Sequence, residues 1–334
     1  MSGRVAIVGT TTWGTTLGIL VARQGVSATL LARSAEEAHR LERHREHRRF
    51  LPGIRFPDAL TVDHDAARAV SSAQLVILAV PSDQLRQNLR WVRDSISQGS
   101  VIVSATKGLE LPEGRRMSQV VAEELPAGLH RGICVLSGPN LAKEVVQGKP
   151  ASTVVAARDP AAAAAAQATL MSPNFRVYTS DDVIGVELGG ALKNIIALGA
   201  GIGDGLGVGD NAKAAFITRG LAEITRLGIA AGANPLTLAG LAGLGDLIAT
   251  CASPLSRNHY VGVQLAQGRS WPEVRESMEN VAEGVNSTVA ALKLAHGLGV
   301  EMPIAQATHR VLFDGLSPQE ALVELMGRPP RSEW

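Results

Sequence analysis

Short apolar runs separated by longer amphipathic stretches dominate the first half of the chain. Several runs, such as L-V-I-L-A-V at 75–80, are apolar at every position, which is typical of strands in a sheet that helices cover on both faces. Strands that alternate with helices predict parallel pairing through right-handed crossovers, and therefore a doubly wound α/β sheet. The expected strands are residues 5–8, 27–32, 60–62, 75–80, 101–105, 133–136, 153–156 and 176–178.

The pattern changes near residue 186. Strand signals fade, and the remaining chain shows long apolar stretches with a helical period, for example 212–227 and 285–298, that end at glycines. We therefore expect two domains: a dinucleotide-binding α/β domain over residues 1–185 and an all-helical domain over residues 186–334.

The first strand leads into a turn that is suited to bind phosphate. Residues 4–14 read R-V-A-I-V-G-T-T-T-W-G, with the turn at Gly9 and a helix starting near Trp13 and Gly14. In a dinucleotide-binding βαβ unit, the pyrophosphate lies on free N–H groups at such a helix N-terminus. The middle glycine of the G-x-G-x-x-G fingerprint is Thr11 here, so an ordinary strand-to-helix corner is the alternative interpretation.

The tip of the second strand bears on the choice of cofactor. NAD sites commonly place an acidic residue there to bind the ribose 2′-hydroxyl. This tip reads Ala32-Arg33-Ser34, and Arg33 could pair with a 2′-phosphate. We therefore expect NADP(H) as the preferred cofactor and NAD(H) as the second choice, while a solvated surface arginine is the alternative.

Composition and charge narrow the class of protein. The 334 residues carry a formal net charge of +1, so no overall basic field recruits nucleic acid. A charged helix expected over residues 35–49 alternates glutamates with basic residues, as in the pair Glu36 and Arg40, and is interpreted as a solvated face. The separate cysteines Cys134 and Cys251, the lack of a signal-peptide pattern and the lack of an uninterrupted apolar run of membrane length predict a cytoplasmic protein.

Two lysines are candidates for chemistry. Lys107 follows a strand, in the loop S-A-T-K-G, where the ligands of doubly wound sheets bind. Lys193 lies in an almost wholly apolar helical segment, where burial and a nearby second lysine would lower the pKa of its ammonium group. A lysine tuned in this way can exchange a proton with an alcohol or carbonyl oxygen. The alternatives are a solvated loop lysine and a lysine whose head group reaches water.

Further polar residues stand beside glycines and turns. Asn140, after the turn 137–139, is a candidate N-cap or ligand contact, and Asp246 in G-L-G-D-L is a plausible partner of Lys193 or a helix cap. Arg257 in S-R-N offers a planar fork for phosphate, although a surface turn explains it nearly as well. The role of Glu283 in V-A-E-G does not follow from spacing.

Taken together and in order, these segments resemble one known family. The matching stretches are V-G-x-x-x-W-G at 8–14, F-L-P-G-I at 50–54, A-T-K-G-L-E at 105–110, S-G-P at 137–139, A-K-E at 142–144, G-V-E-L-G-G-A-L-K-N at 185–194, D-N-A-K-A-A at 210–215, I-T-R-G-L-A-E at 217–223, G-L-G-D-L at 243–247, S-R-N at 256–258 and V-x-E-G at 281–284. The chain is similar over nearly its whole length to the bacterial-type NAD(P)-dependent glycerol-3-phosphate dehydrogenases.

The resemblance implies a Rossmann-type domain followed by an all-helical substrate domain. It implies reversible reduction of dihydroxyacetone phosphate by NAD(P)H to sn-glycerol 3-phosphate, which supplies phospholipid synthesis, without a metal. By the family pattern, Lys193 exchanges the proton with the help of Lys107 and Asp246. The implied substrate contacts are Lys107, Gly138, Asn140, Lys193, Asp246, Ser256, Arg257 and Asn258. The implied cofactor contacts are Gly9, Thr11, Thr12, Trp13, Gly14, Arg33, Lys107, Ala142, Arg257, Val281 and Glu283.

Two departures from the family pattern keep other interpretations open. Thr11 replaces a glycine and should crowd the pyrophosphate, which leaves a non-catalytic dinucleotide sensor as one alternative. Asn140 and Leu141 replace a Ser or Thr followed by Phe, which leaves a related dehydrogenase of another phosphorylated or carboxylated alcohol as a second alternative. The sequence does not determine the oligomeric state, and a homodimer is the assembly we consider.

Overall fold

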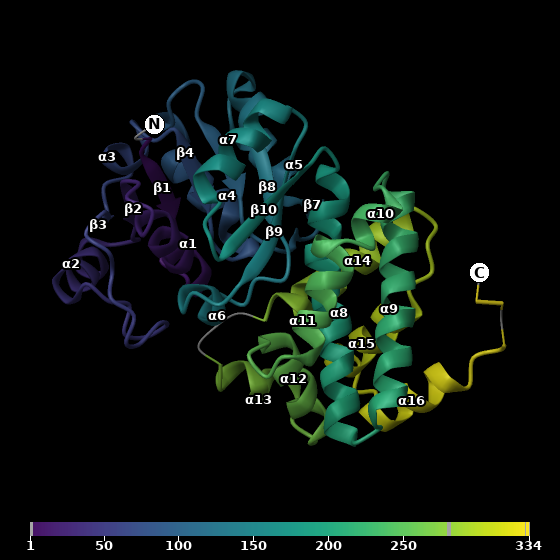
Figure 1. Ribbon diagram of the computed structural model, residues 1–334. Helices are drawn as coiled ribbons and strands as arrows, with labels where there is room; N and C mark the ends of the chain where they lie inside the picture. Colours follow the sequence, from purple (N-terminus) through teal and green to yellow (C-terminus); the bar gives the residue numbers. More distant parts are fainter. Residues whose placement is uncertain (1–2, 279–281, 331, 334) are drawn as a thin grey trace.

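A sheet layer and a helical body make up the molecule (Figure 1). The computed structural model describes residues 3–278, 282–330, 332 and 333. The main sheet has the strand order β10-β9-β8-β5-β4-β1-β2-β3, and every strand predicted from the sequence is present in it. These strands are β1 (Val5–Val8), β2 (Ala28–Leu31), β3 (Leu60–Asp63), β4 (Leu75–Leu78), β5 (Val101–Ser104), β8 (Ile133–Ser137), β9 (Ala151–Ala157) and β10 (Phe175–Ser180).

Helices cover both faces of the sheet, as the continuous apolar strands predicted. Along β1, Val5 and Ile7 belong to one hydrophobic core and Ala6 and Val8 to another, because successive side chains of a strand point to opposite faces. The first core contains residues of α1 (Thr12–Ala22), α6 (Ala142–Val146) and α7 (Pro160–Leu170). The second contains residues of α3 (Ala66–Val70), α4 (Leu85–Val92) and α5 (Met117–Glu124).

The expectation of an entirely parallel sheet was wrong at one position. β8 and β9 pair in antiparallel register, whereas β9 and β10 are parallel to each other. A parallel return needs a crossover that is long enough to carry the chain back along the sheet. The connection after β8 contains only the five-residue helix α6, so the chain turns back beside β8. The eleven-residue α7 then provides a full crossover to β10.

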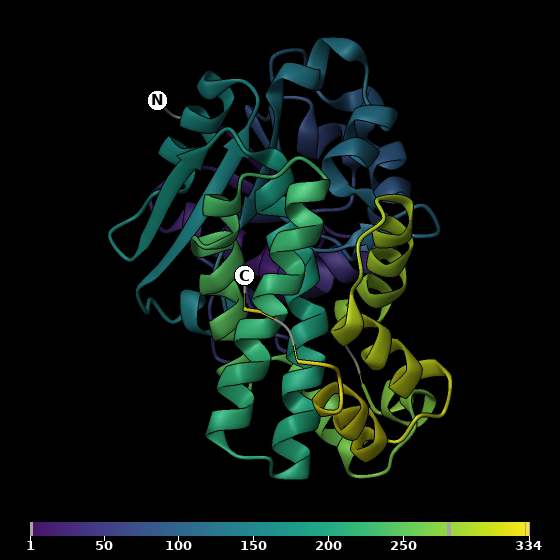
Figure 2. The same ribbon diagram turned by 90° about the vertical axis from the view of Figure 1, so that its right-hand side faces the viewer.

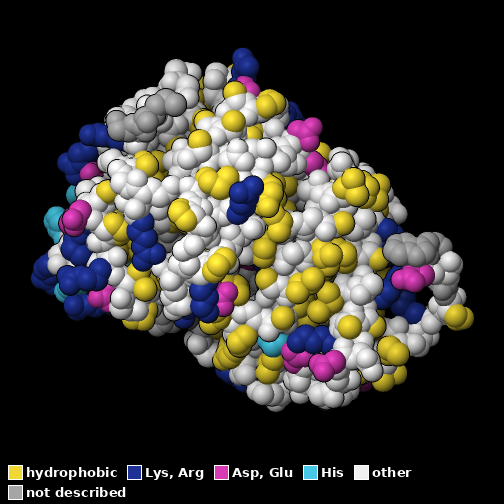
Figure 3. Space-filling model, viewed as in Figure 1, with side chains coloured by type: hydrophobic (Ala, Val, Ile, Leu, Met, Phe, Trp, Pro, Cys, Tyr) yellow, Lys and Arg dark blue, Asp and Glu magenta, His cyan; other side chains and the backbone are white. Residues whose placement is uncertain are grey.

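The charged helix is shorter than predicted. α2 (Ala35–His44) ends at Arg45, which has a left-handed backbone conformation (φ 50°). Residues 46 and 55 then form an antiparallel β-bridge, so the chain folds back between them and the helix does not extend to residue 49. Figure 3 shows acidic side chains interspersed among the basic ones on the α2 side of the molecule, and Arg45 forms an ion pair with Glu42 at 2.7 Å. This arrangement agrees with a solvated face.

The helical body is built around α8 (Val183–Leu206), which is buried along most of its length. In Figure 2 it lies beside α9 (Asp210–Ala230), with the C-terminal helices on the other side. The other helices are α10 (Pro235–Leu238), α11 (Asp246–Ala252), α12 (Arg257–Ala266), α13 (Trp271–Glu276), α14 (Glu283–Gly297), α15 (Pro303–Phe313) and α16 (Pro318–Met326). α9 and α14 include the predicted helical stretches at 212–227 and 285–298, with the last residue of the second stretch as the C-cap of α14.

Within the described residues, two helical stretches are long and apolar enough to cross a membrane, although the sequence analysis expected no span. The first is α8 itself, and 78% of its apolar window is buried inside the protein, as in the core helix of a soluble protein. The second, Pro235–Ala252, is interrupted by a turn of π-helix between α10 and α11. Length and composition alone are weak evidence for a span.

A small hairpin that the sequence analysis missed connects the two parts of the molecule. Its strands, β6 (Leu109–Glu110) and β7 (Arg115–Arg116), pair in antiparallel register. Leu109 is buried in the core of the helical body. The hairpin also contacts the α/β part, because Glu110 forms an ion pair with Arg86 of α4 at 2.7 Å. It therefore packs against both parts of the molecule.

Candidate active site between the sheet and the helices

Four loops that carry polar groups meet at one edge of the sheet. β8, β5, β4 and β1 are neighbours in this order, and each adjacent pair is parallel. Their carboxyl ends therefore lie at the same edge, followed by Gly138, Lys107, Ser82 and Gly9, respectively. Ligands of doubly wound sheets bind at this edge.

The turn after β1 has the tight geometry that its glycines predict. Gly9 has φ 110°, and a Cβ atom there would lie 2.7 Å from the carbonyl oxygen of Ala79. A Cβ atom on Gly14 would lie 2.3 Å from the carbonyl oxygen of Gly9. Both positions therefore require glycine, and the close approach brings the N-terminus of α1 against the end of β1.

The side chain of Thr11 forms two hydrogen bonds that stabilise the turn after β1. Its Oγ1 atom accepts a hydrogen bond from the backbone N–H of Gly14 at 3.1 Å and donates one to the carbonyl oxygen of Ala79 at 2.7 Å. Thr11 is therefore the N-cap of α1. The cap occupies one of the N–H groups that a helix N-terminus could otherwise offer to phosphate.

Asp246 brings the two candidate lysines together. Lys193 Nζ donates to Asp246 Oδ1 at 2.7 Å, and Lys107 Nζ donates to Asp246 Oδ2 at 2.7 Å. Lys107 also donates to the carbonyl oxygen of Gly138 at 2.9 Å. Lys193 Nζ also donates a hydrogen bond to Thr250 Oγ1 at 2.5 Å. One carboxylate thus bridges a strand loop of the α/β part and the central helix of the helical body.

The surroundings of Lys193 favour proton exchange near neutral pH. Its side chain is 9% exposed, and burial lowers the pKa of its ammonium group from 10.5 to about 8. Asp246 opposes this shift, and the positive charge of Lys107 adds to it. The ammonium group is therefore a stronger acid than an ordinary lysine.

Arg257 and Glu283 lie close enough to each other to interact electrostatically. Arg257 is the first residue of α12 and is exposed to solvent, although many protein atoms surround its side chain. The crowding lowers the pKa of its guanidinium group, and Glu283 opposes that shift. Glu283 accepts hydrogen bonds from the backbone N–H of Ser82 at 3.1 Å and from Ser82 Oγ at 2.5 Å, which joins α14 to the loop after β4.

The neighbours of Arg257 hold α12 against α8. The amide of Asn258 donates to Asn194 Oδ1 at 2.9 Å and accepts from the backbone N–H of Gly284 at 2.9 Å. Ser256 caps α12 by accepting from the backbone N–H of His259. These contacts place the S-R-N segment beside the helical turn that follows Lys193.

Asn140 does not cap the following helix, contrary to one of the two roles considered for it. The N-cap of α6 is Leu141, without a side-chain cap. The Asn140 amide nitrogen donates to the carbonyl oxygen of Ser152 at 3.0 Å, and its buried Oδ1 atom has no hydrogen-bond partner. An unpaired buried acceptor is costly unless a ligand or water satisfies it.

The remaining predicted cofactor contacts lie in several places. Thr12 and Trp13 begin α1, and the indole Nε1 of Trp13 is buried without a partner. Arg33 is exposed and hydrogen-bonds the side chain of Gln84. Ala142 begins α6, which packs against α1. Val281 lies outside the described residues.

A carboxylate that the sequence analysis did not consider lies beside Arg33. Glu37, in the first turn of α2, accepts from Thr10 Oγ1 at 2.7 Å and from the backbone N–H of Arg33 at 3.4 Å. It is the fourth residue after the strand tip, where helix geometry returns it toward the turn. A carboxylate therefore lies beside the tip of β2, although no acidic residue is part of the tip itself.

Three further residues of the site were missed, and each had a weak signal. Thr250 is four residues after Asp246, on the same face of α11, and Asn194 directly follows Lys193. Ser82 follows a buried strand, as Lys107 and Gly138 do. Spacing alone did not distinguish these polar residues from ordinary caps and turns.

Two further features concern metal sites and cavities in the part of the chain that the structure describes. Within it, no group of three or more His, Cys, Asp or Glu side chains could hold a metal ion. A cavity of about 410 Å³ is lined by residues of α14, α15, α16 and the segment after α16, Arg328 included. It shares no residue with the lysine–aspartate cluster.

Comparisons with known proteins agree with this geometry. Residues 4–163 match the family model of the NAD-dependent glycerol-3-phosphate dehydrogenase N-terminus, and residues 182–323 match that of the C-terminus. The chain is 51% identical over 324 residues to a glycerol-3-phosphate dehydrogenase [NAD(P)+] of Dehalococcoides mccartyi, covering 97% of this chain and 90% of that relative. The chain belongs to the NAD-dependent glycerol-3-phosphate dehydrogenase family.

Other members of the family give the same result. The relative from Chlorobium limicola is 47% identical over 98% of this chain and 99% of its own length. The crystal structure of glycerol-3-phosphate dehydrogenase from Coxiella burnetii has a TM-score of 0.92 at 35% identity, covering 98% of this chain and 99% of that one. A ketopantoate reductase family protein from Ralstonia eutropha, at 17% identity and a TM-score of 0.63, shares the fold alone.

Proposed function

We propose that this chain reduces dihydroxyacetone phosphate reversibly to sn-glycerol 3-phosphate with NAD(P)H, and so supplies a precursor of glycerophospholipids. The observation that carries the proposal is the buried cluster in which Lys193 and Lys107 share Asp246 between the two parts of the molecule. It supplies both proton exchange and positive charge where a carbonyl oxygen would become an alcohol.

The experiment is an assay of NADPH and NADH oxidation with a panel of carbonyl substrates. We expect rapid loss of the nicotinamide absorbance with dihydroxyacetone phosphate and little with its non-phosphorylated or carboxylated analogues. Faster turnover of a carboxylated analogue would favour the second candidate, which the Asn140 substitution suggests. Binding of either cofactor without turnover of any substrate would favour a sensor.

The reduced cofactor, when bound, supplies the hydride that adds to C2 of the substrate. Lys193 then donates a proton from Nζ to the C2 oxygen, while Lys107 stabilises the negative charge that grows on that oxygen. Asp246 keeps both amines in place and keeps Lys193 charged. Arg257 binds the phosphate and so fixes the face of the carbonyl that is presented.

The residues around the turn after β1 fit a dinucleotide. Gly9 and Gly14 make the tight approach of strand and helix, and the indole N–H of Trp13 is a buried donor without a protein partner. We propose that Gly9, Thr11, Thr12, Trp13, Gly14, Arg33, Lys107, Ala142, Arg257 and Glu283 contact the cofactor. The substrate contacts that we propose are Lys107, Gly138, Asn140, Lys193, Asp246, Ser256, Arg257 and Asn258.

Cofactor preference should depend on the opposed charges of Arg33 and Glu37. Arg33→Ser removes the cation for a 2′-phosphate and is expected to lower kcat/KM for NADPH about tenfold, with little change for NADH. Glu37→Gln removes a neighbouring anion and should increase the ratio of kcat/KM for NADPH to kcat/KM for NADH. The measurement is kcat/KM for each cofactor in three proteins, and equal ratios in all of them would contradict this assignment.

Three coarser properties accompany the proposal. We place the domain boundary at residues 185 and 186, in the first turn of α8, shortly after β10 ends at Ser180. We place the enzyme in the cytoplasm, consistent with its free, buried cysteines Cys134 and Cys251. A homodimer is the proposed assembly, and sedimentation analysis would distinguish it from the 34.9 kDa monomer.

A further inference from the structure

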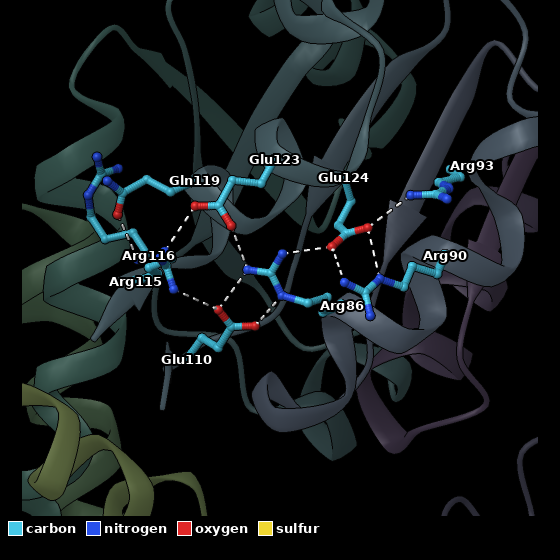
Figure 4. Close-up of polar contacts among 9 residues, drawn as sticks. All are labelled: Arg86, Arg90, Arg93, Glu110, Arg115, Arg116, Gln119, Glu123 and Glu124. Carbon is cyan, nitrogen blue, oxygen red and sulfur yellow. Dashed lines mark hydrogen bonds and ion pairs between the residues drawn. The ribbon is translucent and has the colours of Figure 1, made fainter. Parts of the chain in front are cut away.

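A network of arginines and glutamates lies against the hairpin that follows Lys107 (Figure 4). Its centre is Arg86 on α4, which binds Glu110 through two parallel hydrogen bonds, Nε to Oε1 at 2.7 Å and Nη2 to Oε2 at 2.8 Å. Arg86 also binds Glu123 at 2.6 Å and Glu124 at 2.7 Å, both on α5. One guanidinium group therefore joins α4, α5 and the end of β6.

Glu110 is three residues after Lys107, in the hairpin between the two parts of the molecule. Leu109, between them, is buried in the helical core. Beyond the turn, Arg116 forms an ion pair with the buried carboxylate of Glu187 on α8 at 2.6 Å. The helical body therefore holds the hairpin at Leu109 and Arg116, while Arg86 holds it from the α/β side.

The loop that carries Lys107 is held on both sides of this residue. On one side, Thr106 Oγ1 donates a hydrogen bond to the carbonyl oxygen of Val80 at 2.8 Å, and on the other side the hairpin is held by Arg86. Gly108, the residue after Lys107, has φ 159° and lies against Ser82 and Glu283. Arg86 is four residues after Ser82. The Arg86–Glu110 contact therefore anchors the hairpin side of the Lys107 loop to α4, the helix that follows the loop after β4.

We infer that Arg86 and Glu110 are positioning residues that hold the Lys107 ammonium group on Asp246 and beside the substrate oxygen. The inference rests on the proposed function of the lysine cluster. A fork-to-carboxylate contact fixes both distance and orientation, and a displacement of about 1 Å at a reacting group can cost 10²-fold in rate.

An ordinary surface ion pair is the competing explanation. Exposed pairs contribute little to stability, but the side chains of Arg86 and Glu110 are only 23% and 16% exposed. The hydrogen bonds from Arg86 lower the pKa of the Glu110 carboxyl, and those from the glutamates raise the pKa of Arg86. The pair therefore remains charged around neutral pH and does not itself contribute to a pH profile there.

The test compares Glu110→Gln and Arg86→Lys with the control Arg90→Gln. Arg90 lies on the same helix and in the same network, but it binds Glu124 and not Glu110. Glu110→Gln and Arg86→Lys are expected to lower kcat/KM for dihydroxyacetone phosphate about tenfold. A displaced Lys107 repels Lys193 less, so the alkaline limb of the profile should also move to higher pH. Arg90→Gln should retain the wild-type rate and profile.

Two further measurements separate positioning from general stability. Combined with Lys107→Ala, Glu110→Gln should cause no additional loss of rate, because its effect passes through Lys107. Acetylation of surface amines, read by mass spectrometry with Lys213 as the internal reference, should label Lys107 faster in Glu110→Gln than in wild type or Arg90→Gln.

The labelling result does not depend on which substrate the enzyme uses. Equal Lys107 labelling in wild type and Glu110→Gln would overturn the inference. So would a Glu110→Gln substitution that lowers the rate by the same factor in the Lys107→Ala background as in wild type. Failure of wild type to use any substrate of the panel would instead overturn the proposed function. Should Glu110→Gln unfold, Arg86→Lys carries the same comparison, because a lysine cannot reproduce the two parallel bonds.

Discussion

Replacing Lys193 by alanine is expected to lower kcat for dihydroxyacetone phosphate by roughly 10²-fold or more. The ammonium group of Lys193 is the buried donor of the cluster, and burial lowers its pKa to about 8. NADPH should still bind, because the turn after β1 and the helix α1 do not include Lys193. The measurements are steady-state kinetics and a fluorescence titration with NADPH.

The matched control for this variant is Lys213→Ala. Lys213 lies on α9 in the same helical body and forms an ion pair with Asp204 at 2.6 Å, outside the active site. Its replacement should leave kcat unchanged. Near-normal turnover of Lys193→Ala, or an equal loss in both variants, would show that Lys193 is not the proton donor.

Replacing Asp246 by asparagine is expected to have an effect of similar size. The carboxylate raises the pKa of Lys193, whereas Lys107 lowers it. Without the carboxylate, the two ammonium groups repel each other and the pKa of Lys193 falls below about 8. The alkaline limb of the reduction profile should then move to lower pH, and kcat near neutral pH should fall by roughly 10²-fold.

A stability measurement must accompany this variant, because removing one partner of a buried ion pair typically costs about 3–5 kcal/mol. Asp204→Asn is the matched control, since the Asp204 carboxylate also contacts two side chains, those of Lys213 and His259. A shift of the Asp246→Asn profile to higher pH would contradict the electrostatic account. So would an unchanged profile in a folded protein.

The central strands were predictable because they are short apolar runs, and β1 and β4 are buried at every position. The edge strand β10 alternates buried and exposed residues over its first four positions, which is the other pattern that indicates a strand. The directions of the strands were not equally predictable. The reversal between β8 and β9 depends on the length of the helix that joins them, and α6 was not recognisable as too short for a crossover. The hairpin β6–β7 was missed because strands of two residues show no periodicity.

Lys193 and Lys107 could be chosen from the sequence as candidate catalytic residues, but their shared contact with Asp246 could not be predicted from it. Lys193 was notable as a cation in an apolar helix, and that feature is local. Its contact with Asp246 spans 53 positions, and the contact of Lys107 with the same carboxylate spans 139. The packing of α11 against α8 brings Asp246 to Lys193, and the packing of the helical body against the loop after β5 brings Lys107 to the same carboxylate. Hydrophobic periodicity does not specify which side chains meet across such interfaces.

The prediction for Thr11 considered its effect on the ligand but not its contacts within the protein. The sequence analysis considered what a threonine would do to a bound pyrophosphate. The structure adds that its hydroxyl binds Ala79 and caps α1, so the residue stabilises the turn that glycine would leave less constrained. Glu37 was not predicted for a similar reason. It lies in the first turn of α2, beyond the strand tip where an acidic residue was expected.

The most direct test of the account is the pH dependence of kcat/KM in both directions of the wild-type reaction. Reduction needs the charged amine of Lys193 as an acid, so its rate should fall as pH rises through about 8. Oxidation needs the neutral amine as a base, so its rate should rise through the same pH. Two limbs of opposite slope at one pH are the predicted result, whereas limbs at unrelated pH values, or a reduction rate that rises above pH 8, would contradict the assignment of Lys193.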